Sequence, residues 1–441
     1  MKFPCALAAP AAIVLSAGAS LAAIPFDPPV SVAAPQRPST TAIADFDGDL
    51  DLDLAVTTDT PDKISFFLND GSGVFTAGPT VLTGGGTGPE GIAAHDLDGD
   101  GDQDLVVVLQ NINTARVFVN NGAMTFAAGS SAPVGSDARG LYKTDLNGAG
   151  GPEFLTANRD DNTITVISAT GLTLSSTAVN SGGIEPRAAA AGDLDGDGDN
   201  DVAVTNHDDP PNIVVFSNTG GALAIAATIP IGGTVRPNGI DIGNVDGDTD
   251  NDLVVTVDDD DQGLNFVRPY LNNGAFSFTP GANLPTGGSN PDTVVARDLD
   301  LDGDTDIAVT NQDSGSLSIL ENTGAGAFAA AIVTPIGTRA EHIAIGTLDA
   351  NATPDIVVTA RDANAAFILL NDTVITPPPC PADFNGDNAV TSADITSFLN
   401  AWFADLAGGT TVADFNASGA TNSADITAFL AAWFAALDGT C

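Results

Sequence analysis

Five loops of this chain carry acidic residues at a spacing that suits the binding of a metal ion. Aspartate, in one place asparagine, recurs at positions 1, 3, 5 and 9 of a nine-residue pattern such as DLDGDGDND. Calcium takes about six to eight oxygen ligands, which alternating carboxylates in a tight, glycine-containing loop can supply. The candidate calcium ligands are Asp45, Asp47, Asp49 and Asp53 in the first loop, Asp96, Asp98, Asp100 and Asp104 in the second, Asp193, Asp195, Asp197 and Asp201 in the fourth, Asn244, Asp246, Asp248 and Asp252 in the fifth, and Asp298, Asp300, Asp302 and Asp306 in the sixth.

Two weaker copies, DLNGAGGPE from Asp145 and TLDANATPD from Thr347, fill the gaps in the series. The third loop has Ala149 at position 5 although Glu153 keeps an acid at position 9, and the seventh has Asn351 at position 5. We expect both to bind calcium weakly or not at all. Magnesium is the competing ion, but flexible loops with several carboxylates favour calcium. Because clustered carboxylates repel one another without a cation, the predicted role of the ions is structural.

The loops recur every 48 to 54 residues, which indicates seven repeated units. In the second unit, Gly91–His95, the β-branched run from Asp104, and the segments from Ala115 and Thr125 are four expected strands. Four short strands per unit predict a mainly β fold, a seven-bladed β-propeller. A parallel β-helix is the alternative, but its coils are much shorter. No fourth strand follows the segment from Ala365, so Phe26–Val32 is expected to complete blade seven and leave no free sheet edge.

A different calcium pattern follows a proline-rich linker at 376–381. Two 12-residue loops, DFNGDNAVTSAD and DFNASGATNSAD, each precede an apolar segment of helical length, from Ile395 and from Ile426. Their spacing is that of an EF-hand loop, with a backbone carbonyl at position 7 and an acid at position 12. The candidate ligands are Asp383, Asn385, Asp387, Ala389, Thr391 and Asp394 in the first loop, and Asp414, Asn416, Ser418, Ala420, Asn422 and Asp425 in the second.

The repeats resemble the FG-GAP/VCBS family, which includes the propellers of integrin α-subunits. The resemblance covers residues 24–375 and rests on the loop aspartates, the glycine after the second of them, and the Asp-Leu-x-Val strand that follows. The small all-α C-terminal domain, residues 380–441, resembles a dockerin, which implies a cohesin-like or other surface protein as partner. Only half of the dockerin's paired Ser/Thr signature is present, in Ser392-Ala393 and Ser423-Ala424. A calcium-stapled cap that only protects the C-terminus is the alternative.

The chain has the features of an exported protein. Residues 1–23 combine Lys2, an apolar stretch and small residues at a cleavage position, which is typical of a signal peptide. Cys380 and Cys441 remain after cleavage and are predicted to form a disulfide, worth roughly 4 kcal/mol by loop closure. The net charge of −44 disfavours binding to nucleic acid or anionic membranes, and no segment is expected to span a membrane. We expect a secreted, periplasmic or surface-associated protein.

Most basic residues are expected on the propeller face opposite the acidic loops. This ligand face is predicted to hold Arg139, Arg159, Arg187, Arg236, Arg339 and Arg361. It would suit an anionic ligand, either an acidic polysaccharide or a carboxylate-bearing protein loop. Alternatively, the arginines pair with neighbours such as Glu90, Glu185, Asp292 and Glu341 and only hold blades together.

We find no catalytic constellation, since His95, His207 and His342 are isolated in the sequence. The predicted function is that of a secreted, non-catalytic, calcium-binding propeller that mediates binding or adhesion and is anchored through its tail. The alternative is an exported polysaccharide-degrading hydrolase or lyase on the same scaffold.

Overall fold

The computed structural model describes residues 24–148, 151–232, 235–259, 263–373, 382, 384, 390–408, 413, 415 and 421–437. The chain divides into two compact units, Met1–Thr373 and Val374–Cys441. The predicted signal peptide and linker, Cys380 and Cys441 lie outside the described residues, so the cleavage and the disulfide stay predictions. No helix in the described part of the chain has the length and apolar character needed to span a membrane.

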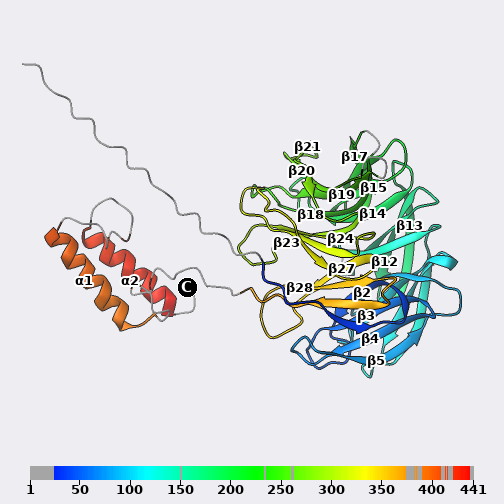
Figure 1. Cartoon of the computed structure of the whole chain (residues 1–441), viewed down its shortest axis with the longest axis horizontal. Helices are drawn as coiled ribbons and strands as arrows, with labels where there is room; N and C mark the ends of the chain where they lie inside the picture. The colour runs from blue at the N-terminus through cyan, green and yellow to red at the C-terminus, as the bar shows by residue number, and fades with distance from the viewer. Residues whose placement is uncertain are drawn as a thin grey trace, which may run out of the picture. The chain divides into compact units, whose positions relative to one another are not determined.

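The first unit is built almost entirely of strands, which fall into four sets (Figure 1). The first strands of the blades are β2 (Gln36–Ala44), β6 (Pro89–His95), β10 (Ala138–Thr144), β14 (Pro186–Gly192), β18 (Arg236–Gly243), β23 (Pro291–Arg297) and β27 (Ala340–Gly346). The second strands are β3 (Asp53–Thr60), β7 (Asp104–Leu109), β11 (Glu153–Asn158), β15 (Asp201–Asn206), β19 (Asp252–Asp259), β24 (Asp306–Asn311) and β28 (Asp355–Ala360). The third strands are β4 (Asp62–Asn69), β8 (Thr114–Asn120), β12 (Thr163–Thr170), β16 (Asn212–Thr219), β20 (Leu264–Asn272), β25 (Ser316–Leu320) and β29 (Ala365–Leu369). The outer strands are β5 (Phe75–Leu82), β9 (Phe126–Pro133), β13 (Thr173–Asn180), β17 (Ala222–Pro230), β21 (Phe278–Pro280) with β22 (Leu284–Pro285), β26 (Ile332–Pro335) and β1 (Val30–Ala33). A short 3-10 helix, η1 (Gln110–Ile112), follows β7.

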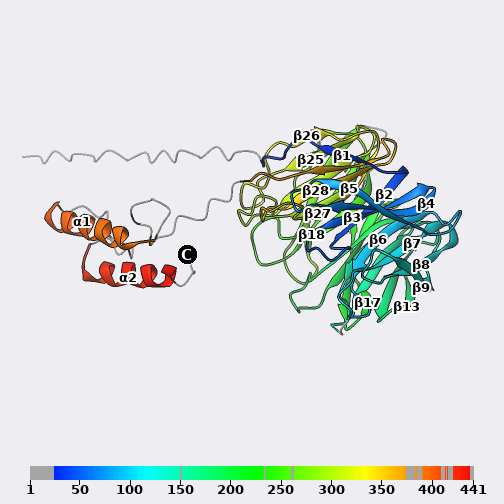
Figure 2. The same ribbon diagram turned by 90° about the horizontal axis from the view of Figure 1, so that it is seen from below.

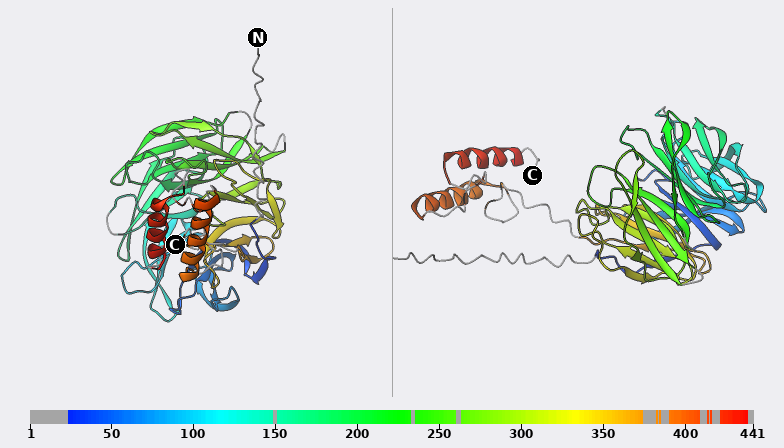
Figure 3. Two further views of the ribbon diagram at one scale, coloured as in Figure 1. Left: turned by 90° about the vertical axis from the view of Figure 1, so that its left-hand side faces the viewer. Right: turned by 90° about the horizontal axis from the view of Figure 1, so that it is seen from above.

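These strands form seven antiparallel sheets, which are the predicted seven blades. Neighbouring first strands contact one another around the ring, and β27 of the last blade contacts β2 of the first. In the left view of Figure 3 the colours follow one another around this ring until yellow lies beside blue.

The N-terminal strand closes the ring, as the sequence predicted. β1 pairs with β29 in the order β1-β29-β28-β27, with Val30 opposite Ile368. Phe26 adds an isolated bridge to Asn371. Pairing of the first and last segments in one sheet gives blade seven four strands, as in every other blade except the five-stranded blade five.

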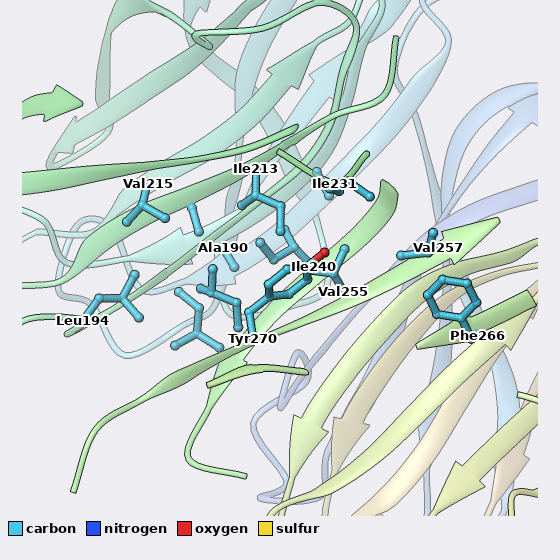
Figure 4. Packing of buried hydrophobic residues seen from close by; sticks show 14 residues of the cluster. Ala190, Leu194, Ile213, Val215, Ile231, Ile240, Val255, Val257, Phe266 and Tyr270 are labelled. Carbon is cyan, nitrogen blue, oxygen red and sulfur yellow. The ribbon is translucent and has the colours of Figure 1, made fainter. Parts of the chain in front are cut away.

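Apolar residues gather between blades and explain why the second strands are buried on both faces. Seven clusters of buried side chains lie one between each pair of neighbouring blades. In the largest, Ile213 and Val215 of blade four meet Val255 and Tyr270 of blade five (Figure 4). A central strand such as β15 faces a neighbour on either side, so all six of its residues are buried.

The second unit contains two helices, α1 (Ser392–Gly408) and α2 (Ser423–Leu437), that lie side by side (Figures 1 and 2). Phe398 stacks on Phe429 with ring centroids 4.3 Å apart. The indole of Trp402 donates to the Asn422 carbonyl and that of Trp433 to the Thr391 carbonyl, both at 2.9 Å. Because each helix end meets the other's beginning, the pair is antiparallel. Both helices begin three residues before the predicted Ile395 and Ile426.

Candidate functional site

The acidic loops join the first and second strands of every blade, as predicted, and therefore share one face. Their position 9 is the first residue of the second strand and is buried. In the sixth loop, Asp306 accepts the N–H of Leu299 at 2.9 Å and that of Asn322 at 2.8 Å, one with each oxygen. The carboxylate thus ties the loop to the third strand, and its remaining lone pairs are available to a cation.

This hydrogen-bond pattern recurs in every blade that has an acidic residue at position 9 and asparagine at the end of the third strand. Burial raises the pKa of Asp53 and of Asp252 to about 6, and that of Asp306 to about 7. The charges of neighbouring loop aspartates contribute to these shifts as well. Without a cation, these loops therefore hold carboxylates whose ionised form is unfavourable.

The structure brings the predicted ligands together in groups of three in four of the five strong loops. The grouped residues, each with an oxygen within 4.8 Å of the others, are Asp45, Asp47 and Asp53; Asp96, Asp98 and Asp104; Asp193, Asp195 and Asp197; and Asp298, Asp300 and Asp302. In the fifth loop, where Asn244 takes position 1, the described aspartates form no such group. Oxygen donors alone at this spacing fit a hard divalent cation.

The two degraded loops use their oxygens for contacts within the protein. In the third, Glu153 accepts from the Leu146 amide at 2.9 Å and from the Asn147 side chain. In the seventh, Asp349 accepts from the backbone and side-chain amides of Asn351, at 3.0 and 3.1 Å. Ala149 lies outside the described residues. The strong sixth loop makes matching contacts from the Leu299 and Asp302 amides, so the expected weak binding of these two loops stays a prediction.

The sequence reasoning missed an asparagine that links neighbouring blades. In six of the seven blades it lies at or just after the end of the third strand, and its side chain donates to the position 2 carbonyl in the loop of the preceding blade. The pairs are Asn69 to Leu348, Asn120 to Phe46, Asn218 to Leu146, Asn272 to Leu194, Asn322 to Val245 and Asn371 to Leu299. Blade three has Ala169 at this place. The signal was present as a recurring asparagine 16 to 20 residues after position 9.

On the opposite face a cavity of about 360 Å³ opens where the first strands converge. One residue from each blade, always six positions before its acidic loop, lines this cavity; the seven are Ser39, Glu90, Arg139, Arg187, Asn238, Asp292 and Glu341. We call them the inner ring. Arg159, His207, Asp258 and Gln312, six positions after position 9 of their blades, line it as well.

Five of the six predicted ligand-face arginines line this cavity, and Arg361 does not. The side chain of Arg361 is only 7% exposed and pairs with Asp59 at 3.0 Å and with Glu90 at 3.4 Å. For Arg361 the structure therefore agrees with the alternative interpretation, in which the arginine forms ion pairs that hold blades together. His207 and His342 also line the cavity, and His207 is buried, which its isolated place in the sequence did not indicate.

The remaining arginines are partly paired. Arg159 contacts Asp137 at 3.1 Å and also Glu185, which Arg187 contacts at 3.2 Å as well. Arg139 pairs with Asp137, and Arg339 with Glu341. Arg236 is exposed and forms no ion pair with any residue that the structure describes. Three arginines thus share two acids in blades three and four, which leaves this side of the cavity positive.

The opposite side of the cavity is acidic. Asp292 accepts a hydrogen bond from Gln312 at 2.7 Å and lies near Glu341. Burial, together with the charge of Glu341, raises the pKa of Asp292 to about 6. Burial and the guanidinium of Arg187 lower the pKa of His207 to about 4, so this imidazole is neutral at pH 7.

In the C-terminal unit the structure describes four of the predicted ligands. Asp394 and Asp425 are fully buried and accept the N–H of Thr391 at 2.8 Å and of Asn422 at 2.7 Å, at the starts of the two helices. Thr391 and Asn422 cap the helices by accepting the N–H of Ala393 and Ala424. Asp383, Asn385, Asp387, Ala389, Asp414, Asn416, Ser418 and Ala420 lie outside the described residues, so these sites stay predictions.

Seven antiparallel blades, each with an acidic loop after its first strand, define a repeat-built β-propeller. The model for the FG-GAP-like repeat matches residues 45–107, 96–156, 145–204, 193–255, 244–309 and 298–358, and the chain belongs to this family. That fold supports a role in binding or as a scaffold.

Several solved structures are similar to this chain. A protein from Lactobacillus plantarum has a TM-score of 0.51 and 16% identity over 68% of this chain and 86% of its own. An Agrocybe aegerita lectin, described by its recognition of non-reducing terminal N-acetylglucosamine, has a TM-score of 0.47 and 18% identity over 68% of this chain and 81% of its own. A functionally unknown protein from Desulfotomaculum acetoxidans has a TM-score of 0.42 and 16% identity, over 58% and 72%. These likenesses concern the fold. The comparison with curated proteins gave no match.

Proposed function

We propose that this propeller is a non-catalytic binding module whose central cavity takes an anionic ligand. The observation that carries the proposal is the inner ring, in which all seven blades place one residue at the same cavity. Polar and charged side chains form most of the lining, and only a few apolar residues, such as Ile240 and Val294, contribute. Such a surface recognises its ligand through hydrogen bonds and charge.

The uneven charge of the cavity favours an acidic polysaccharide over a protein loop. Arg187 and the exposed Arg236 stand on the positive side and can receive a carboxylate or sulfate group. Asp292 and Glu341 stand on the acidic side and can accept hydrogen bonds from hydroxyl groups. A sugar acid offers both kinds of group within one or two residues, and a cavity of about 360 Å³ can hold a segment of that size.

The test is a binding array of neutral and acidic polysaccharides, probed with the chain and with matched charge variants. Arg187→Gln and Arg236→Gln should each weaken binding to the acidic members by about tenfold or more. Arg116→Gln, on the third strand of blade two and outside the cavity lining, is the control and should bind as the parent does. Equal binding by all three variants would refute the proposal.

A second candidate, an exported polysaccharide-degrading enzyme, has one observation in its favour. Asp292, with its pKa raised to about 6, lies near Glu341, and a pair of carboxyl groups can act as general acid and base on a glycosidic bond. Depolymerisation of the bound polysaccharide that is abolished in Asp292→Asn would establish this candidate. Binding without turnover would exclude it for the substrates tested.

Calcium in the acidic loops, export and attachment through the tail complete the proposal. The oxygen clusters support calcium, and FG-GAP propellers are commonly extracellular. Phe403 and Phe434 occupy the same place in the two C-terminal helices, and both are 62% exposed, which supports a docking surface. A cohesin-like or other surface protein is the proposed partner. A cohesin-type protein should bind the full chain and not a chain that ends at Thr373. Failure to bind the full chain would favour the alternative, in which the C-terminal unit only protects the end of the chain.

A further inference from the structure

The sixth acidic loop differs from the others in the hydrogen bonding of its first aspartate. In loops one to five, the glycine at position 4 donates its N–H to the side-chain oxygen of position 1: Gly48 to Asp45, Gly99 to Asp96, Gly148 to Asp145, Gly196 to Asp193 and Gly247 to Asn244, at 2.7 to 2.9 Å. The sixth loop has Leu301 at position 4 and lacks this bond. Asp298 therefore keeps Oδ1 buried and without a hydrogen-bond partner among the described residues.

Blade six also places an additional acid beside this loop. Glu321 directly precedes Asn322, whose N–H is bound by Asp306 of the loop at 2.8 Å. The equivalent residues of the other asparagine-bearing blades are Leu68, Val119, Ser217, Leu271 and Leu370. Glu321 is 5% exposed, and its Oε1 accepts no hydrogen bond from a described residue. Burial, and to a lesser extent the charge of Asp302, raise the pKa of Glu321.

Two buried carboxylate oxygens without donors are costly unless a cation compensates them. No basic residue in the described part of the chain pairs with either oxygen; Arg297, the nearest in sequence, instead donates to Asp241 and to the Ala296 carbonyl. The loop itself groups oxygens of Asp298, Asp300 and Asp302 within 4.8 Å. Asp298 belongs to this group, and Glu321 directly precedes Asn322, whose N–H binds Asp306 of the same loop.

We propose that Glu321 is an additional ligand of the sixth loop and makes it the tightest divalent-cation site of the propeller. Calcium is the expected ion, because it accepts more carboxylate ligands than magnesium does. The inference rests on the proposed calcium binding of the acidic loops, and it adds a ligand from a third strand, outside the repeated pattern.

The test is a calcium titration of the full chain against a chromophoric chelator, with Glu321→Gln as the variant. Glu321→Gln keeps the shape of the side chain and removes its charge, so the tightest class of sites should weaken about tenfold or more. Asp313→Asn removes an exposed charge from the other end of blade six and is the matched control. It should leave the titration unchanged.

Thermal unfolding separates a ligand from a merely structural residue. In chelator, Glu321→Gln should raise the melting temperature, because the variant removes an uncompensated buried charge. In excess calcium, it should lower the melting temperature relative to the parent. Shifts in the same direction under both conditions, or an unchanged tightest class, would overturn the inference while leaving calcium binding by the other loops intact. A parent chain that binds no calcium would overturn both.

Discussion

Replacing Asn322 by alanine should destabilise the propeller by roughly 2–4 kcal/mol. The side chain is 1% exposed and makes three hydrogen bonds: to the Val245 carbonyl of blade five at 2.8 Å, to the Thr305 carbonyl at 3.1 Å, and from the Gly324 amide at 3.2 Å. Each buried hydrogen bond contributes about 0.5–1.5 kcal/mol net, and a carbonyl left unsatisfied costs more. The estimate is the sum of these three contacts.

Two further variants separate hydrogen bonding from packing. Asn322→Asp keeps the shape and the acceptor but replaces the NH2 donor with an oxygen that faces the Val245 carbonyl, so it should be at least as destabilising as alanine. Asn121→Ala removes an exposed asparagine at the corresponding turn of blade two and should stay within about 0.5 kcal/mol of the parent.

The two units can be followed separately during unfolding. The chain has two tryptophans, Trp402 and Trp433, and both lie in the C-terminal helices, so their fluorescence reports on that unit. The β-sheet circular dichroism signal reports on the propeller. Asn322→Ala should lower the urea midpoint of the circular dichroism transition and leave the fluorescence transition in place. A circular dichroism midpoint equal to that of Asn121→Ala would refute the inter-blade role of this asparagine.

Three other outcomes follow from the structure. Leu50→Gly should stabilise the propeller by about 0.5–1 kcal/mol in urea unfolding, because Leu50 is 87% exposed at φ 79 where glycine is favoured; Leu50→Ala should give no gain. Folding lowers the pKa of His207 from its usual 6.5 to about 4. Between pH 6.5 and 4 the unfolded chain therefore takes up a proton that the folded chain does not, which should lower stability by up to roughly 3 kcal/mol. His207→Gln should flatten this part of the pH–stability curve. Chelator should lower the circular dichroism melting temperature of the propeller at pH 7, and calcium should restore it; no shift would contradict a structural role for calcium.

The repeat pattern made the fold predictable in detail, since the position of each loop gives the ends of two strands. The closing strand was also visible, because Phe26–Val32 resembles the missing fourth strand. The cavity was harder to predict, because its inner ring becomes apparent only when residues are compared at a fixed distance in sequence from the loops. The ring also includes residues such as Ser39, whose residue type does not by itself indicate a binding site. The sharing of Glu185 between Arg159 and Arg187 depends on neighbouring blades and has no signature in one repeat. The burial of the Glu321 carboxylate likewise depends on how blade six packs, so the sequence alone did not predict it.

The acidic loops and the cavity lie at opposite ends of the same first strands, so we expect calcium in the loops to affect ligand binding in the cavity. In blade four, Arg187 is the second residue of β14, and Asp193 follows the end of that strand. Six residues of extended chain span roughly 20 Å, so a loop that loosens at one end releases the strand that positions the arginine at the other. We therefore expect chelator to weaken binding of an acidic polysaccharide although no calcium ligand lines the cavity. Asp193→Asn should reproduce part of this loss at saturating calcium, as an increase in the dissociation constant measured by calorimetry. If chelator lowered the melting temperature but left the affinity unchanged, the two faces would be independent.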